Sequence, residues 1–149
     1  MDFAENFSCR SMDEIQTAYW NQTGVTLHPI VVYYMQNGNL KHKSLVMISD
    51  DMNHSAGTVK RFIEDLIPQL LEIDPEMMKI YYWTDSPSSQ YRNRYMFNDV
   101  ASHGEMYGIL ATWNYFDAGH GKGPRDVLGD TVKRLADEVI FTGGQLVHP

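Results

Sequence analysis

The sequence is poor in cysteine and in long apolar runs, and each shortage excludes a class of protein. Cys9 is the only cysteine among 149 residues, so an intrachain disulfide and a cysteine-based zinc site are impossible. We therefore expect a reducing, intracellular location, nuclear or cytoplasmic. No apolar run approaches the roughly 20 residues of a membrane-spanning helix, and the acidic, polar start has no signal-peptide pattern. We expect no membrane partner.

Positive charge is also scarce, since 12 Lys and Arg residues face 19 Asp and Glu residues, a formal net charge of −7. This balance argues against a free-standing DNA-binding domain, which is normally basic, but it suits a group of acids that holds cations. The 43% of hydrophobic residues indicates a folded globular protein. We expect one domain over residues 1–149, with a frayed tail at 142–149. The abrupt start at Met1-Asp2 is compatible with a fragment of a longer protein.

Hydrophobic periodicity predicts an α/β fold. Asn37-Gly38 predicts a hairpin turn, because this dipeptide tolerates the positive φ of a type I′ turn. Pro68 lies inside a helical pattern, so a kink or break is expected there. The expected elements in chain order are a first strand near Phe3 and Phe7, strands at 25–35 and 42–49, a helix at 55–72, a strand from 79, a helix at 90–100, a strand at 108–116 and a helix at 127–140. A meander followed by βαβ units predicts one mixed sheet with helices on both faces.

Asp85 stands where the aromatic strand ends, before a Ser-Pro-Ser-Ser segment that interrupts the extended chain. Open α/β sheets place their sites at the carboxyl ends of central strands, which makes this acid a candidate site residue. Taken alone, the segment favours a simpler interpretation, in which Asp85 only caps the following helix.

Three segments carry a resemblance to a known group of proteins: Asp2-Phe-Ala-Glu-Asn, Tyr82-Trp-Thr-Asp-Ser-Pro-Ser-Ser-Gln-Tyr-Arg-Asn-Arg94 and Trp113-Asn-Tyr-Phe-Asp-Ala-Gly-His-Gly-Lys-Gly-Pro-Arg-Asp126. They resemble transposon-derived animal proteins that look like DDE-type transposases of the ribonuclease-H-like superfamily. The likeness covers nearly the whole chain, and its third segment is the most specific. It implies a ribonuclease-H-like sheet and a polynucleotidyl transferase or nuclease core that cleaves or joins DNA phosphodiesters.

The resemblance also implies the site. Asp2, Asp85 and Asp126 match the three acids that bind two Mg²⁺ or Mn²⁺ ions, which activate a water or 3′-hydroxyl and stabilise the leaving oxygen. Asp2 matches the first-strand acid that can bridge both ions. The loop after Asp126 departs from the pattern of the group, which makes Asp130 a rival for the third position.

Five further residues are candidates for the same site. His120 is a possible extra metal ligand or proton shuttle, and its alternative is a histidine that only hydrogen-bonds a glycine-rich turn. Lys122 and Arg125 flank that turn and are expected to contact phosphates. Arg92 and Arg94 are expected to bind the nucleic-acid backbone, with a solvated helix face as the alternative.

The implied partners are DNA, a second copy in a homo-oligomer and a separate DNA-binding domain outside this chain. We expect an enzyme. One alternative is a domesticated, inactive ribonuclease-H-like scaffold that acts through protein or nucleic-acid contacts. Another is a ribonuclease or Holliday-junction-type nuclease, which differs only in its substrate.

Overall fold

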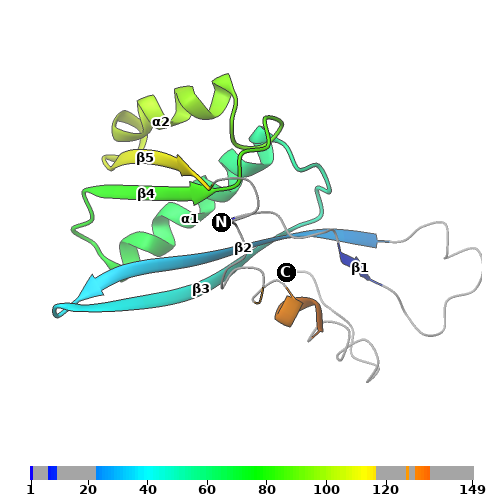
Figure 1. Ribbon diagram of the computed structural model, residues 1–149, viewed down its shortest axis with the longest axis horizontal. Coiled ribbons are helices and arrows are strands. Elements are labelled where there is room, and N and C mark those ends of the chain that lie inside the picture. Colours follow the sequence, from blue (N-terminus) through cyan, green and yellow to red (C-terminus); the bar gives the residue numbers. More distant parts are fainter. Residues whose placement is uncertain (2–6, 10–22, 117–126, 128–129, 135–149) are drawn as a thin grey trace, which may run out of the picture. The chain divides into compact units, whose positions relative to one another are not determined.

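A computed structural model describes residues 1, 7–9, 23–116, 127 and 130–134, and every structural statement below refers to these residues. They form a mixed α/β fold, which confirms the predicted class (Figure 1). The labelled elements are β1 (Phe7–Cys9), β2 (Thr23–Gln36), β3 (Asn39–Ser49), α1 (Ala56–Ile73), β4 (Lys79–Thr84), α2 (Arg94–Tyr107) and β5 (Leu110–Tyr115). No helix in this part of the chain combines the length and the apolar character needed to cross a membrane.

The described residues belong to two compact units, and the first sheet lies in the unit that contains 7–9 and 23–52. In this sheet β2 is central and pairs antiparallel with β1 and with β3. Asn37 and Gly38 connect β2 to β3 with φ angles of 52° and 77°, as a type I′ turn requires. The predicted hairpin is thus confirmed, and the pairing of Gln36 with Asn39 makes the connection a two-residue turn.

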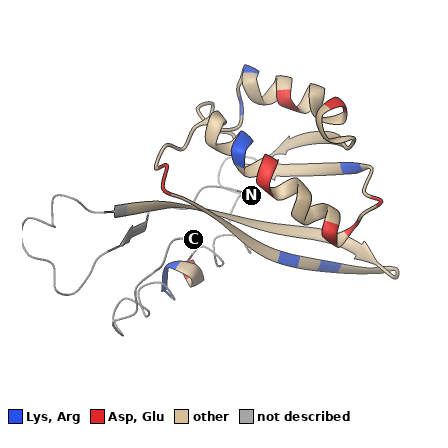
Figure 2. Cartoon of the chain, turned by 180° about the vertical axis from the view of Figure 1, so that it is seen from behind, with Lys and Arg blue, Asp and Glu red and all other residues tan. Residues whose placement is uncertain are grey.

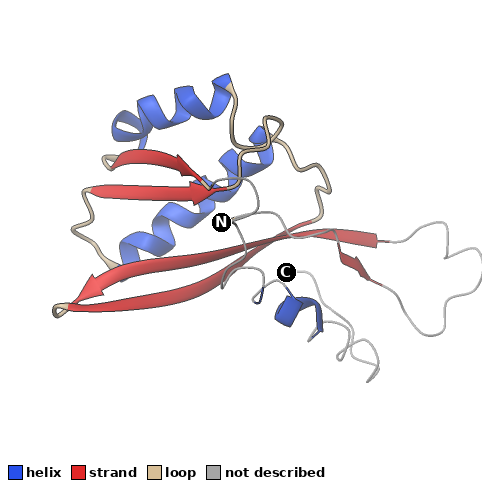
Figure 3. Cartoon of the chain, viewed as in Figure 1, coloured by secondary structure: helices blue, strands red, loops and turns tan. Residues whose placement is uncertain are grey.

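The hairpin has a buried base and an exposed tip. At the base, Leu27 and Ile30 are buried, and the hydroxyl of the buried Thr26 donates to the carbonyl of Asp51 at 2.8 Å. Toward the turn the side chains are open, and Met35 and Leu40 are 65% and 68% exposed. Burial of the side chains therefore falls along the two strands from the base to the turn. Figure 3 draws both strands in red on either side of that turn.

The second unit contains Met1 and residues 53–116, and α1 supplies much of its core. Ser55 caps this helix by accepting the N–H of Thr58. Of the apolar positions that predicted the helix, Leu71 is half-buried and the others are buried, namely Val59, Phe62, Ile63, Leu66, Ile67 and Leu70. The break expected at Pro68 is wrong, because α1 runs through this residue from Ala56 to Ile73, with the proline side chain exposed.

The second sheet is the parallel pair β4–β5, with α2 packed on β5 and α1 beside α2. The expected helix at 90–100 is wrong in its bounds, since α2 starts at Arg94. The N–H groups of Gln90, Tyr91 and Arg92 all point to the carbonyl of Pro87, which forms a turn that delays the helix. Gly108, at φ 71°, ends α2, so β5 begins later than the expected strand at 108–116.

A buried phenol–imidazole pair joins β4 to α2. The hydroxyl of Tyr82 lies 3.0 Å from Nε2 of His103, whose Nδ1 bonds to the carbonyl of Ile109. Because Nδ1 faces an acceptor it carries the proton, which leaves Nε2 to accept from Tyr82. Burial, and then the neighbouring Tyr107 phenol, raise the pKa of Tyr82 well above its ordinary value of 10.

This raised pKa predicts a loss of stability at alkaline pH. Above about pH 10 the unfolded chain releases the Tyr82 proton while the folded chain keeps it, so stability falls as pH rises, by at most about 1.4 kcal/mol per pH unit for one proton. Urea unfolding from pH 8 to pH 11 should show this fall. It should be shallower in Tyr82→Phe and unchanged in Tyr33→Phe, which alters an exposed ring. Equal slopes in all three proteins would show that Tyr82 is not the cause.

Candidate functional site

Asp85 lies at the carboxyl edge of the parallel pair, by which we mean the carboxyl ends of β4 and β5. It directly follows Thr84, the last residue of β4, and Thr84 pairs with Tyr115, the last residue of β5. The side chain of Asp85 is half-buried. The sequence-based prediction that Asp85 terminates a strand is confirmed, and this edge is where open α/β sheets place ligands.

A chain of hydrogen bonds holds the backbone at this edge. The indole Nε1 of Trp113 donates to the hydroxyl of Thr84 at 2.9 Å, and that hydroxyl donates to the carbonyl of Asp85 at 2.8 Å. On the neighbouring strand, the N–H of Phe116 donates to the carbonyl of Thr84 at 2.9 Å. Because Thr84 is fully buried, these bonds are shielded from water and fix the point from which the Asp85 carboxylate projects.

The alternative in which Asp85 caps the following helix is wrong. Asn93 caps α2, because its Oδ1 accepts the N–H groups of Tyr95 and Met96, each at 3.1 Å. Its Nδ2 also donates to the carbonyl of Ser88 at 2.9 Å, which ties the cap back to the loop after Asp85. The N-cap of α2 is therefore Asn93 and not Asp85.

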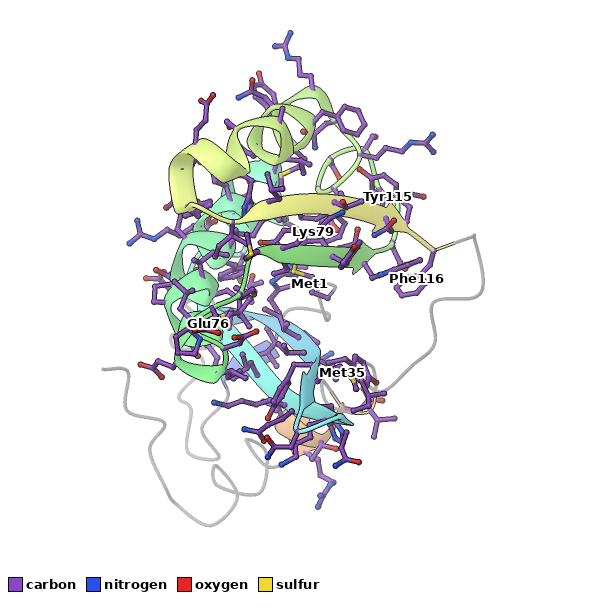
Figure 4. The ribbon with its side chains drawn as sticks, turned by 90° about the vertical axis from the view of Figure 1, so that its left-hand side faces the viewer. Met1, Met35, Glu76, Lys79, Tyr115 and Phe116 are labelled. Atoms are coloured by element: carbon purple, nitrogen blue, oxygen red, sulfur yellow. The ribbon has the colours of Figure 1, made fainter. Side chains whose placement is uncertain are left out.

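Met1 lies against β4, where it contacts Trp83, two residues before Asp85 in the chain. Its backbone nitrogen donates to the carbonyl of Trp83 at 2.8 Å (Figure 4). Asp2 is the next residue in the chain, but it lies outside the described residues, so its expected place on the first strand stays a prediction. The first strand among the described residues is β1, which pairs with β2.

Arg92 and Arg94 are both exposed, at the loop and helix end that follow Asp85. The guanidinium of Arg92 lies 5.8 Å from the ring centre of Tyr115, whose hydroxyl donates to the carbonyl of Tyr91 at 3.0 Å. Arg92 belongs to the turn and not to the expected helix. Arg94 opens α2, and its guanidinium donates to the Tyr95 hydroxyl at 2.9 Å.

Arg94 also borders a groove between the N-terminal ends of α1 and α2. Other residues that line the groove are Ser55, Lys60, Ser89 and Asp99. Lys60 and Asp99 form an ion pair at 3.5 Å, which leaves Arg94 as the cation of this groove without a carboxylate partner among the described residues. Lys60 was not a sequence-based candidate, because nothing in its helix spacing places it beside Arg94.

Besides Asp2, four predicted site residues lie outside the described residues, namely His120, Lys122, Arg125 and Asp126. The rival acid Asp130 is exposed and helical. Across the described ranges, no three His, Cys, Asp or Glu side chains gather closely enough to hold a metal ion. Asp85 is thus the one expected ligand whose surroundings are known in detail.

The sequence-based reasoning missed Thr84 and Trp113, which position Asp85 without belonging to any motif. One signal was present, since a Trp on a strand needs a partner for its indole N–H when that strand is packed. The tryptophan alone does not name the partner, because Thr84 becomes its neighbour only when β5 pairs with β4 in this register.

Comparison with known proteins yields one match. No curated protein and no solved structure matches the chain. A family model described as a domain of unknown function, DUF8701, matches residues 1–147. Because this match covers nearly the whole chain, the protein belongs to the DUF8701 family.

Proposed function

We propose that the chain is the catalytic core of a metal-dependent polynucleotidyl transferase or nuclease that cleaves or joins DNA phosphodiesters. The observation that carries the proposal is the placement of Asp85. A half-buried carboxylate projects from the carboxyl edge of β4–β5, on a backbone held by Trp113 and Thr84. Chemistry of this kind depends on positioned charge, and a rigid strand end supplies the position.

The order of elements supports a ribonuclease-H-like sheet as part of this proposal. Three antiparallel strands come first, and β4 and β5 then form a parallel pair connected through α2. Met1 supports the placing of Asp2, because a residue hydrogen-bonded to β4 directly precedes it. In the proposed site Asp2 and Asp85 come from the first and fourth strands, as the resemblance to DDE-type transposases implies.

The residues present fit a hard divalent cation. Asp85 offers carboxylate oxygens, the ligands that Mg²⁺ and Mn²⁺ prefer, and it is partly open to solvent. In the proposal Asp85, Asp2 and Asp126 hold the ions, with Asp130 as the rival for the third place. Two such ions, when bound, supply activation of the attacking oxygen and stabilisation of the leaving one.

The chain itself then has two tasks. Asp85 holds its carboxylate at a fixed point, because the Thr84 and Trp113 bonds limit the motion of its backbone. Arg92 and Arg94, on the segment that follows, attract the phosphates of a DNA strand and orient it toward the carboxyl edge. The proposed site also includes His120, Lys122 and Arg125, whose roles rest on the sequence alone.

Metal binding to the folded protein is the first test of this proposal. Acids that converge on a cation repel one another without it, so Mg²⁺ or Mn²⁺ at about 100 times its dissociation constant should stabilise the fold by about 2.7 kcal/mol, or roughly 5–10 °C in melting temperature. Asp85→Asn should lose most of that rise, whereas Glu72→Gln, which removes an exposed charge on α1, should keep it. A rise that survives in Asp85→Asn would place the metal elsewhere, and no rise in the wild type would favour an inactive scaffold.

A further inference from the structure

The hairpin tip, by which we mean residues 33–43, is an exposed ribbon with an unusual charge. Lys41 and Lys43 are exposed, and neither forms an ion pair with any residue that the structure describes. The chain has 19 acids, yet none occurs from 15 to 49. Figure 2 shows β3 with blue bands and no red on either strand of the hairpin. In an otherwise acidic protein, this arm is a local region of positive charge.

The pairing register places both lysines on one face of the ribbon. Lys41 pairs with Tyr34 and Lys43 with Val32, and cross-strand partners and alternate residues share a face. The rise of a strand separates the two lysines by about 6.7 Å, close to the axial length of two nucleotides at about 3.4 Å each. The lysines can therefore meet two phosphates of one strand that are two nucleotides apart.

The opposite face of the tip is apolar and aromatic. Tyr33 lies across from His42, with ring centres 6.0 Å apart, and Met35 pairs with Leu40. Met35 projects from the hairpin in Figure 4. A two-stranded ribbon of this kind has the width that the major groove of B-DNA accepts.

We propose that the hairpin tip is a DNA-binding arm that enters the major groove of duplex DNA and contacts the phosphate backbone through Lys41 and Lys43. The assignment rests on the proposed function for its choice of DNA as the partner. The argument for DNA is charge complementarity. Two lysines without an ion-pair partner in the described part of the chain stand on an acid-free ribbon, and phosphates are the matching anions. Such contacts carry no base information, so the binding is independent of sequence and weak, no tighter than about 10⁻⁶ M at physiological salt.

The test compares two double variants that remove the same charge. Anisotropy of a labelled 20-base-pair duplex is measured at several salt concentrations in EDTA, with wild type, Lys41→Gln/Lys43→Gln and the control Arg61→Gln/Lys79→Gln. Arg61 and Lys79 are exposed cations of the other compact unit. In Lys41→Gln/Lys43→Gln, the loss of two phosphate contacts should make the negative slope of log K against log salt shallower by about 1.8. Binding at low salt should weaken about tenfold or more. The control should bind like the wild type.

The outcomes separate the arm from the proposed catalysis. Equal losses in both double variants, or none in the arm variant, would overturn the arm. Polyglutamate that competes as well as unlabelled duplex would assign the arm to acidic proteins and overturn its assignment to DNA. Loss of binding in the arm variant with an unchanged melting temperature supports the arm, even if no metal-dependent cleavage is found. Cleavage that depends on Asp85, together with normal binding by the arm variant, would support the proposed function and reject the arm.

Discussion

Asp85→Asn is expected to reduce metal-dependent cleavage or strand transfer on DNA by about 100-fold or more, the scale seen when one positioned electrostatic group is removed from an active site. The substitution keeps the size of the side chain but removes the negative charge that holds the ions in the proposed site. The half-buried side chain projects from a backbone that is fixed by Thr84, so the fold should be preserved. Cleavage of a labelled duplex in Mg²⁺ and in Mn²⁺ measures the loss.

Two controls make this result specific. Glu72→Gln removes an acid that is exposed near the end of α1 and should cleave like the wild type. Thr84→Val keeps the carboxylate but removes the hydroxyl that bonds to Trp113 and to the Asp85 carbonyl, so a partial loss is expected. Full activity in Asp85→Asn would contradict the proposed site, even if the protein proved to be a nuclease.

Tyr91→Ala is expected to cost about 3–5 kcal/mol of unfolding free energy, because it empties a large, fully buried site. Tyr91 anchors the loop between β4 and α2. Its N–H donates to the carbonyl of Pro87, its own carbonyl accepts the Tyr115 hydroxyl, and its ring lies 6.1 Å from that of Trp113. Total stabilities are about 5–15 kcal/mol, so the variant should be close to unfolding.

The matched control is another tyrosine four positions further along the chain. Tyr95 is 60% exposed at the start of α2, and Tyr95→Ala should change the unfolding free energy by no more than about 0.5 kcal/mol. Urea unfolding of both variants gives the comparison. Similar costs at the two positions would mean that Tyr91 is not the anchor of the loop and that the segment after Asp85 is held in another way.

Much of the fold could be predicted because its signals are local. The turn at Asn37 and Gly38 depends on two residues that accept positive φ, and the spacing of apolar residues in α1 depends on one helix. The start of α2 could not be predicted in this way. The serines after Asp85 and Asn93 are all acceptable caps, and the choice of Asn93 depends on a turn around Pro87.

The candidate site was predictable only in part, for a similar reason. The position of Asp85 at a strand end is a local property and was predicted correctly. The bonds that fix it come from Trp113, which the chain reaches only after α2, and no local pattern identifies such a partner. The proposal that Asp2 and Asp126 meet Asp85 concerns tertiary structure in the same way, and both acids lie beyond the described ranges.

The two sheets differ in how far along the chain their partners lie, and this difference has a consequence for folding. The β2–β3 hairpin can close from its turn outward, pair by pair, on the microsecond scale typical of hairpins. Each residue pair between β4 and β5 instead closes a chain segment that contains the whole of α2. The entropy of that segment is therefore lost before any pairing stabilises the sheet. The proposed DNA arm therefore belongs to the early, local part of folding. The carboxyl edge that presents Asp85 is complete only when β5 has returned to β4, so the proposed site forms late in the folding reaction.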